Sequence, residues 1–207
     1  TADILIIGGS VMGASAAYHL AQRGLKNIVL LEKEDFFGQG ATGRCAGGVR
    51  YQFSTEINVK LSIESLPMIE RFKDEIGQEV SYKQCGYLLV ATNEKDANAF
   101  RYNVKLQNKL GVSTQLLSGD EVRARLPLMK FDDAIVGTFN PKDGTVDPNS
   151  VVMGYISAAQ KMGVKAITGA EVIGVTVSGD QVDEVQTTLG AIKTRMILNA
   201  AGPWAGQ

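Results

Sequence analysis

The sequence has few of the residues that build disulfide frameworks or metal sites. Its 207 residues include two cysteines, Cys45 and Cys85, and one histidine. The cysteines fit neither a C-x-x-C motif nor a zinc-ligand spacing, so we expect no disulfide framework and no bound metal. A reducing, cytoplasmic location is therefore the default prediction.

Long apolar runs and an excess of charge of either sign are also missing. No apolar run approaches the roughly 18 residues that a membrane-spanning helix requires. The formal net charge is -1, with 21% charged and 44% hydrophobic residues. This balance offers no basic surface for nucleic acids or anionic membranes, and it indicates an ordinary globular protein with room for a sizeable core.

Glycine, by contrast, is abundant, with 23 residues that gather in short stretches. The first stretch, Gly8-Gly9-Ser10-Val11-Met12-Gly13, lies between an apolar run at 3–7 (DILII) and a helical pattern at 12–23. A second apolar run, 27–32 (NIVLLE), follows the helix. The order strand, glycine turn, helix, strand predicts a βαβ unit with buried parallel strands.

The glycine turn has the pattern G-x-G-x-x-G with Ser10 at the middle glycine. Gly8 permits a sharp exit from the strand, Gly13 lets the helix pack closely, and the helix N-terminus attracts a pyrophosphate. Glu32 ends the second strand, where a carboxylate can accept hydrogen bonds from ribose hydroxyls and disfavours NADP. Turn and acid together predict a dinucleotide site, against the alternative of a plain strand–helix turn with a surface acid.

The rest of the chain alternates helical and strand patterns. Helices are predicted at 55–76 (kinked at Pro67), 94–110, 118–126 and 147–162, and strands at 85–91, 134–140, 165–168, 171–177, 181–187 and 191–199. The last of these helices has Asp147 as its predicted N-cap, followed by proline. We expect an α/β fold in which a Rossmann-like nucleotide-binding βαβ domain, 1–79 and 147–207, carries an inserted α+β substrate-domain segment, 80–146.

The loop at 36–50, FFGQGATGRCAGGVR, indicates which dinucleotide is bound. A nicotinamide dinucleotide needs no second glycine-rich loop after the ribose acid, whereas this loop has five glycines where an extended ligand would leave the pyrophosphate. At this point the sequence resembles the FAD-dependent amine and amino-acid oxidoreductases typified by glycine oxidase, sarcosine oxidase and D-amino-acid oxidase. It is most similar to the β subunits of dye-linked L-proline dehydrogenase and sarcosine oxidase. The resemblance covers the whole chain and rests on IIGGSVMGASAAYHLAQRG, VLLEK, GATGRCAGGVRYQF, CGYLLVA, FNPKDGTVDP and NAAGPWA, in this order.

The resemblance implies FAD as the cofactor and a set of residues that bind it. They are Gly8, Gly9, Ser10, Val11, Met12 and Gly13 at the pyrophosphate; Glu32 and Lys33 at the adenosine ribose; Thr42, Gly43, Arg44 and Cys45 beside the pyrophosphate and ribityl chain; Gly47 and Gly48 at the flavin; Val172 at the adenine, through its backbone; and Ala200, Ala201, Gly202 and Trp204 where the last strand returns to the cofactor. Arg50 is the predicted catalytic residue, near the flavin and the substrate carboxylate. The alternative is an ordinary solvated or salt-bridged loop arginine.

The activity that the resemblance implies is oxidation of the C–N bond of a proline-, sarcosine- or glycine-like amino acid or secondary amine. A hydride passes to flavin N5, and the resulting imine hydrolyses in water. The expected electron acceptor is a partner subunit or dye-like carrier, and a homo- or hetero-oligomer is compatible with this. Because members of the family are longer, we expect an N-terminal portion that is inactive alone. The alternative is a non-catalytic FAD-binding or electron-relay subunit.

Overall fold

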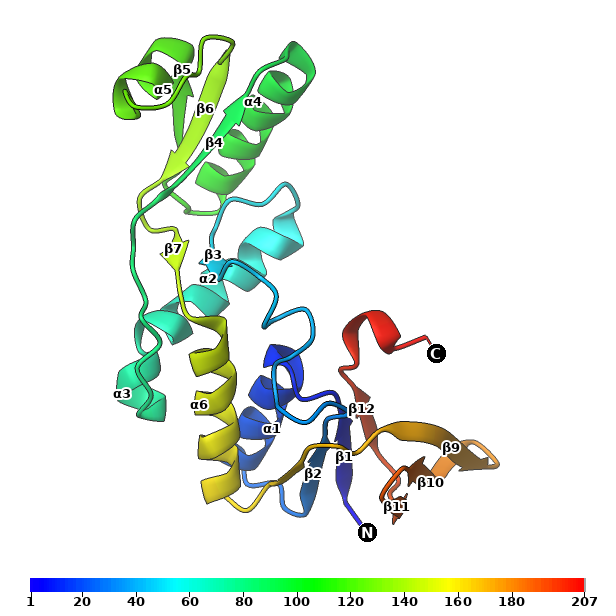
Figure 1. Ribbon diagram of the computed structural model, residues 1–207. Helices are drawn as coiled ribbons and strands as arrows, with labels where there is room; N and C mark the ends of the chain where they lie inside the picture. The colour runs from blue at the N-terminus through cyan, green and yellow to red at the C-terminus, as the bar shows by residue number, and fades with distance from the viewer. Residues whose placement is uncertain (207) are drawn as a thin grey trace. The chain divides into compact units, whose positions relative to one another are not determined.

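The computed structural model describes residues 1–206, which form two compact units (Figure 1). The first unit contains Thr1–Gly47, Lys73–Val80 and the chain from Asp147 onward, and the second contains Gly48–Phe72 and Ser81–Val146. The division expected from the sequence differs from these units mainly at residues 48–72, which were expected in the nucleotide-binding part and pack in the second unit.

Four parallel strands form the central sheet of the first unit, in the order β12-β1-β2-β8. They are β12 (Ile197–Asn199), β1 (Ile4–Ile7), β2 (Ile28–Leu31) and β8 (Lys165–Ile167). β1 and β2 are apolar and almost entirely buried, which is typical of parallel strands covered on both faces. With helix α1 (Val11–Gln22) between them, these strands confirm the predicted βαβ unit and the α/β class.

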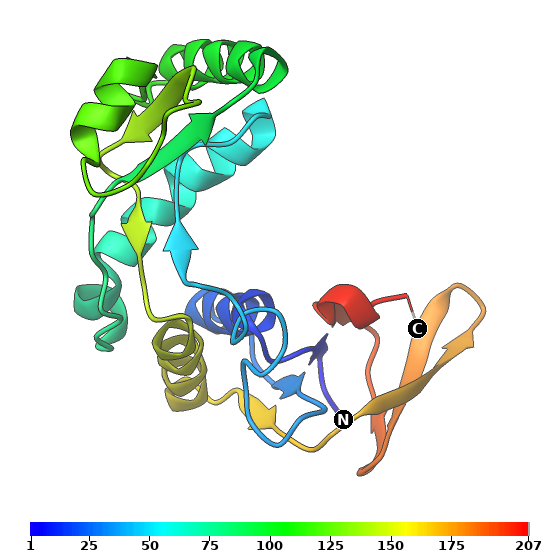
Figure 2. The same ribbon diagram turned by 45° about the horizontal axis from the view of Figure 1, so that its top comes forward.

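Both faces of this sheet are covered. Helices α1 and α6 (Pro148–Lys161) pack against each other on one face. The other face packs on an antiparallel sheet formed by β9 (Val172–Ser178), β10 (Gln181–Thr187) and β11 (Gly190–Lys193), whose long β9–β10 hairpin is visible in Figure 2. Leu5, Val29 and Val185 belong to the core between the two sheets.

The second unit is built on an antiparallel sheet in the order β4-β6-β5. The strands are β4 (Tyr87–Ala91), β6 (Val136–Asn140) and β5 (Gln115–Ser118). Helix α4 (Glu94–Lys109) packs on one face, where Phe100 contacts the Ala91 and Val136 cluster. Helix α5 (Gly119–Arg125) covers the other face with Val122. The sequence predicted β4 and β6 but not β5.

The prediction of one continuous helix over 55–76 is wrong. It forms two helices, α2 (Glu56–Glu70) and α3 (Phe72–Ile76). Pro67 lies inside α2, and the backbone N–H of Arg71 donates to the Pro67 carbonyl just where the helix ends.

Among residues 1–206, no helix combines the length and the apolar character that crossing a membrane requires.

Short pairings between distant segments complete the units. β3 (Gly48–Val49) pairs antiparallel with β7 (Gly144–Thr145), and neither strand was predicted. The strand predicted over 191–199 is two strands, β11 and β12, because Thr194 turns the chain with a side-chain bond to Met196. A 3-10 turn, η1 (Gly202–Trp204), follows β12.

Candidate functional site

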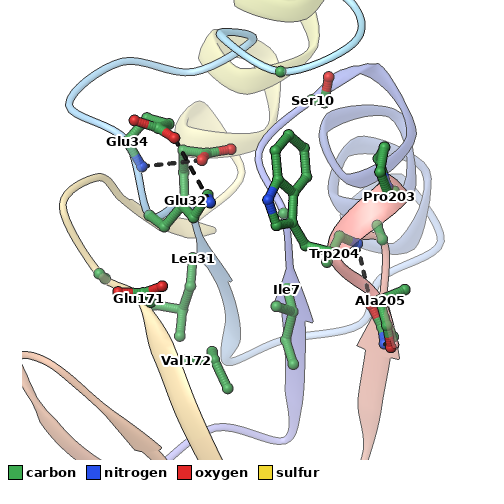
Figure 3. A pocket seen from close by; sticks show the side chains of 18 of the residues that line it. Ile7, Ser10, Leu31, Glu32, Glu34, Glu171, Val172, Pro203, Trp204 and Ala205 are labelled. Carbon is green, nitrogen blue, oxygen red and sulfur yellow. Dashed lines mark hydrogen bonds and ion pairs between the residues drawn. The ribbon is translucent and has the colours of Figure 1, made fainter. Parts of the chain in front are cut away.

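A cavity of about 430 Å³ opens at the carboxyl ends of β1, β2 and β12 in the first unit (Figure 3). Its lining comes from the glycine turn, the segment after β2, the loop around Gly40–Thr42, the start of β9 and the segment after β12. Open parallel sheets with helical cover bind their ligands at this edge. The cavity therefore lies where the sequence predicted a dinucleotide.

Two glycines fix the turn between β1 and α1. Gly8 has a φ of +106°, and a Cβ there would lie 2.5 Å from the carbonyl oxygen of Ala200. A Cβ on Gly13 would lie 1.8 Å from the carbonyl oxygen of Gly8. Neither position can hold a side chain without moving the backbone, so the turn, the helix and the end of β12 are packed as one piece.

The N-terminus of α1 faces this cavity, which Ser10 and Met12 help to line. Ser10 is the N-cap residue but gives the helix no side-chain cap, and the first turn contains no acidic residue. Its hydroxyl bonds instead to the Thr42 hydroxyl at 2.7 Å, and Thr42 also accepts the Val11 N–H at 3.4 Å. A helix N-terminus with two hydroxyls and no carboxylate in its first turn can accept a pyrophosphate.

Glu32 is 9% exposed and follows directly on β2. One carboxylate oxygen accepts the Gly9 N–H at 2.8 Å, and the other accepts the Glu34 N–H at 3.1 Å. The bond from Gly9 holds the acid against the glycine turn, and the bond from Glu34 is drawn in Figure 3. Because a carboxylate has about four acceptor positions, Glu32 can still accept hydrogen bonds from ribose hydroxyls.

The opposite walls of the cavity are largely apolar. Val172 opens β9 at one side, and Trp204 in η1 projects into the cavity from the other (Figure 3). The Lys33 ammonium lies 4.4 Å from the centre of the Trp204 ring. Ala200, next to this turn, donates its N–H to the Ile7 carbonyl at 2.8 Å. The Trp204 ring, the edge of β9 and the Glu32 carboxylate together can accommodate an adenine ring and its ribose.

The structure brings most of the predicted cofactor residues to this cavity. Those that line it are Gly8, Ser10, Met12, Glu32, Lys33, Thr42, Val172, Ala200, Ala201, Gly202 and Trp204. Gly9, Val11 and Gly13 lie behind the lining and support the turn. Gly43, Arg44, Cys45 and Gly47 of the first unit, and Gly48 of the second, do not line it, so the ribityl and flavin roles predicted for them stay predictions.

Several lining residues were missed by the sequence analysis. Glu34, Glu171 and Pro203 flank predicted positions, and Asn199 ends β12. Asn199 accepts the Ala201 N–H and thereby shapes the turn that carries Trp204. A strand ending in a polar residue just before a glycine turn was the available signal.

Arg50, the predicted catalytic residue, belongs to the second unit and is half-buried. Its guanidinium lies 5.0 Å from the centre of the Phe53 ring, and its Nε is buried without a hydrogen-bond partner among residues 1–206. No ion pair within that range includes Arg50. The catalytic role of Arg50 and its alternative, a solvated or salt-bridged loop arginine, both stay predictions.

A buried carboxylate fixes the backbone that follows Arg50. Asp143 is fully buried and accepts the Tyr51 N–H at 2.7 Å and the Gln52 side-chain amide at 2.8 Å. Burial raises the pKa of Asp143, and these two hydrogen bonds and the charge of Arg50 offset that rise only in part. Thr138 completes the cluster by donating its hydroxyl to Gln52 at 2.6 Å.

The chain is similar to known flavoproteins over its full length. Residues 3–207 match the family model DAO, FAD dependent oxidoreductase. The chain is 34% identical over 205 residues to mitochondrial dimethylglycine dehydrogenase of Rattus norvegicus, covering 99% of this chain and 24% of that protein. It is 30% identical over 205 residues to the mitochondrial pyruvate dehydrogenase phosphatase regulatory subunit of Mus musculus, covering 99% and 23%.

The chain is also similar to a solved structure over its full length. L-proline dehydrogenase from P. horikoshii superposes with a TM-score of 0.90 at 33% identity, covering all of this chain and 54% of that one. The chain thus spans about a quarter of the length of these curated relatives and about half of the solved chain. With its parallel sheet, its glycine turn and its match over residues 3–207, the chain belongs to the DAO family of FAD-dependent oxidoreductases.

Proposed function

We propose that the protein oxidises the C–N bond of an amino acid or N-substituted amino acid, by transfer of a hydride to the N5 atom of a bound FAD. The single observation that carries the proposal is the first-unit cavity, whose helix N-terminus, acid and apolar walls fit the ADP half of FAD. The named substrates of two relatives, dimethylglycine and L-proline, support the substrate class, because both are N-substituted amino acids.

In this proposal the first unit holds the cofactor. The N-terminus of α1, with the Ser10 and Thr42 hydroxyls, binds the pyrophosphate, and Glu32 binds the adenosine ribose. The backbone at Val172 borders the adenine, and Trp204 covers it. FAD supplies a two-electron acceptor when bound, so the chain needs no nucleophile or metal for this chemistry.

Arg50 is the proposed binding group for the substrate carboxylate. Its guanidinium has no ion pair within residues 1–206, and a carboxylate matches the two parallel N–H donors of an arginine. Binding there orients the substrate carbon whose hydrogen is removed. The imine product leaves the site and is hydrolysed by water.

Anaerobic flavin reduction tests this function. Because residues 1–207 alone are expected to be inactive, the whole protein that contains them is purified and loaded with FAD. L-proline, sarcosine, N,N-dimethylglycine and glycine are then added in turn while the visible flavin absorbance is followed. We expect at least one of them to bleach the flavin, and a redox dye to restore the colour. A protein that binds FAD but is bleached by none of them contradicts the proposed oxidation.

A second candidate function is that of a non-catalytic FAD-binding or electron-relay subunit. It is favoured by the similarity to a protein that is named a regulatory subunit. In this case FAD binds and stays oxidised with every amine, and the protein co-purifies with a partner. An electron-accepting partner subunit and a cytoplasmic location remain predictions for both functions.

A further inference from the structure

Helix α2 of the second unit is apolar on two opposite sides (Figure 1). One side carries Val59 and Leu66, which are buried in a core cluster of the unit. The other side carries Ile57, Leu61 and Met68, which are 63%, 56% and 37% exposed. A helix that is apolar on all sides is typical of a buried helix. The second apolar side of α2 is thus left without a cover among residues 1–206.

The exposed apolar residues follow the spacing of a helix that packs lengthwise on another helix. Together with Glu64 they form the α2 stripe, which consists of Ile57, Leu61, Glu64 and Met68 at intervals of four, three and four residues. Residues at these intervals lie on one face of a helix, as in the seam of a coiled coil. The α2 stripe is therefore a continuous surface, unlike single apolar residues scattered over a protein.

Two charges determine which partner fits the α2 stripe. Glu64 is exposed within the stripe, and no ion pair among residues 1–206 includes it. Lys60 lies at the edge of the stripe, one turn before Glu64, and pairs on its outer side with Glu56 at 2.6 Å. A fitting partner must offer a cation to Glu64 and a carboxylate near Lys60. The helix itself carries this pair of charges, so the α2 stripe is complementary to its own copy.

We propose that α2 packs against α2 of a second copy of this chain, antiparallel and about a two-fold axis. In this register Ile57 lies opposite Met68 of the second copy, and Leu61 lies opposite the apolar stem of Glu64. Lys60 then reaches the Glu64 carboxylate across the axis. A two-fold axis makes every contact twice, so both copies cover their stripes together. The proposal rests neither on the bound FAD nor on the proposed oxidation.

Other arrangements leave the charge of Glu64 in an unfavourable place. A parallel pair about a two-fold axis brings each residue opposite itself, so that Glu64 meets Glu64 and the two carboxylates repel. A purely apolar surface buries the carboxylate without a cation, which costs free energy. The antiparallel copy covers the apolar side chains and supplies the cation at the same time.

Sedimentation equilibrium of the whole protein that contains residues 1–207 tests whether the dimer forms. Because one helix face makes a small interface, we expect a reversible dimer that appears as the concentration rises to about 100 μM. A protein that stays monomeric up to that concentration overturns the proposal. In that case a segment of its own polypeptide covers the α2 stripe, or the stripe faces solvent.

An exchange of charges shows whether a dimer uses this surface. Lys60→Glu makes both charges acidic, and Glu64→Lys makes both basic. Each variant alone should dimerise at least about tenfold more weakly than the wild type, because like charges then meet across the axis. An equimolar mixture of the two variants should recover the wild-type affinity, since every acid again faces a base. Lys95→Glu, at an exposed lysine of α4, is the matched control and should dimerise as the wild type does.

The charge exchange has outcomes that decide the matter. Single variants that dimerise like the wild type place the interface elsewhere and overturn the proposal. A mixture that stays as weak as its components also overturns it, because the two copies then do not meet in the antiparallel register. Flavin bleaching by amines can be measured on the same samples. Bleaching without a dimer removes this inference alone, and a dimer without bleaching removes the proposed oxidation alone.

Discussion

At the scale of single residues, Gly13 is the position where the nucleotide turn tolerates least change. A Cβ there would lie 1.8 Å from the Gly8 carbonyl oxygen, so Gly13→Ala must displace the turn or the helix. We expect the free energy of unfolding to fall by roughly 1–3 kcal/mol and FAD affinity by about tenfold or more. Urea unfolding and a fluorescence titration with FAD measure the two effects. Gly206→Ala is the control, because a Cβ at Gly206 meets nothing within 4 Å.

Asp143 carries a pH dependence whose sign is opposite to that of an ordinary surface carboxylate. Burial raises its pKa in the folded state above the unfolded value of about 3.9, so between the two values the folded protein binds more protons. Its contribution to the free energy of unfolding is therefore greatest below the unfolded pKa and declines as pH rises through the raised one.

Asp143→Asn removes this titration. The free energy of unfolding of the wild type, minus that of the variant, should decrease as pH rises from about 4 into the neutral range. Urea unfolding at a series of pH values measures it. Asp132→Asn, at an exposed aspartate of the same unit, is the matched control. A difference that grows with pH would show that Asp143 is stabilised as a carboxylate.

At the scale of elements, the start of α6 depends on one side chain. The Asp147 carboxylate accepts the N–H groups of Asn149 and Ser150, and the hydrogen bonds from Ser150 and Asn149 lower its pKa. Asp147→Ala should lower the free energy of unfolding by about 1 kcal/mol at neutral pH, and Asp147→Ser, which keeps an N-cap acceptor, should lower it less.

The pH dependence of this cap follows from the lowered pKa. Its stabilisation is complete above the unfolded pKa and disappears as pH falls through the folded one. The penalty of Asp147→Ala should therefore shrink in acid, as urea unfolding near pH 3 can measure. A penalty that is constant with pH would mean that the cap does not depend on the charge.

The elements also show what could be predicted from sequence. Apolar runs, the glycine turn and the Asp147-Pro148 start are local signals, and β1, α1, β2 and α6 follow them. The pairing of Gly48–Val49 with Gly144–Thr145 has no local signal, because the partner strand lies far along the chain. For that reason the sequence did not indicate that residues 48–72 pack in the second unit. In the same way Glu32 was predictable at the end of a strand, whereas the hydrogen bonds that Asp143 accepts from Tyr51 and Gln52 join distant segments.

At the scale of the whole molecule, two units with separate cores should respond separately to a ligand of one of them. ADP carries the adenosine and pyrophosphate but not the flavin. At about 100 times its dissociation constant it should stabilise the first unit by roughly 2.7 kcal/mol. Native-state hydrogen exchange should show this as slower exchange in β1, β2 and α1, with little change in β4 and β6. Equal protection of both sheets would contradict the assignment of the ADP site to the first unit.

The pairing of β1 with β12 has a consequence for how the protein is made. Leu5 lies opposite Ile197, so that side of β1 can be hydrogen-bonded only after the ribosome has made β12, which lies far along the chain. To form such a distant pairing, the chain loses the entropy of closing a long loop before the strand contacts stabilise it. Distant pairings therefore slow folding. Because Gly8 packs directly on Ala200, the nucleotide turn closes at the same late moment. Until then the nascent chain exposes an apolar strand edge, and such edges are prone to pair with other chains and aggregate.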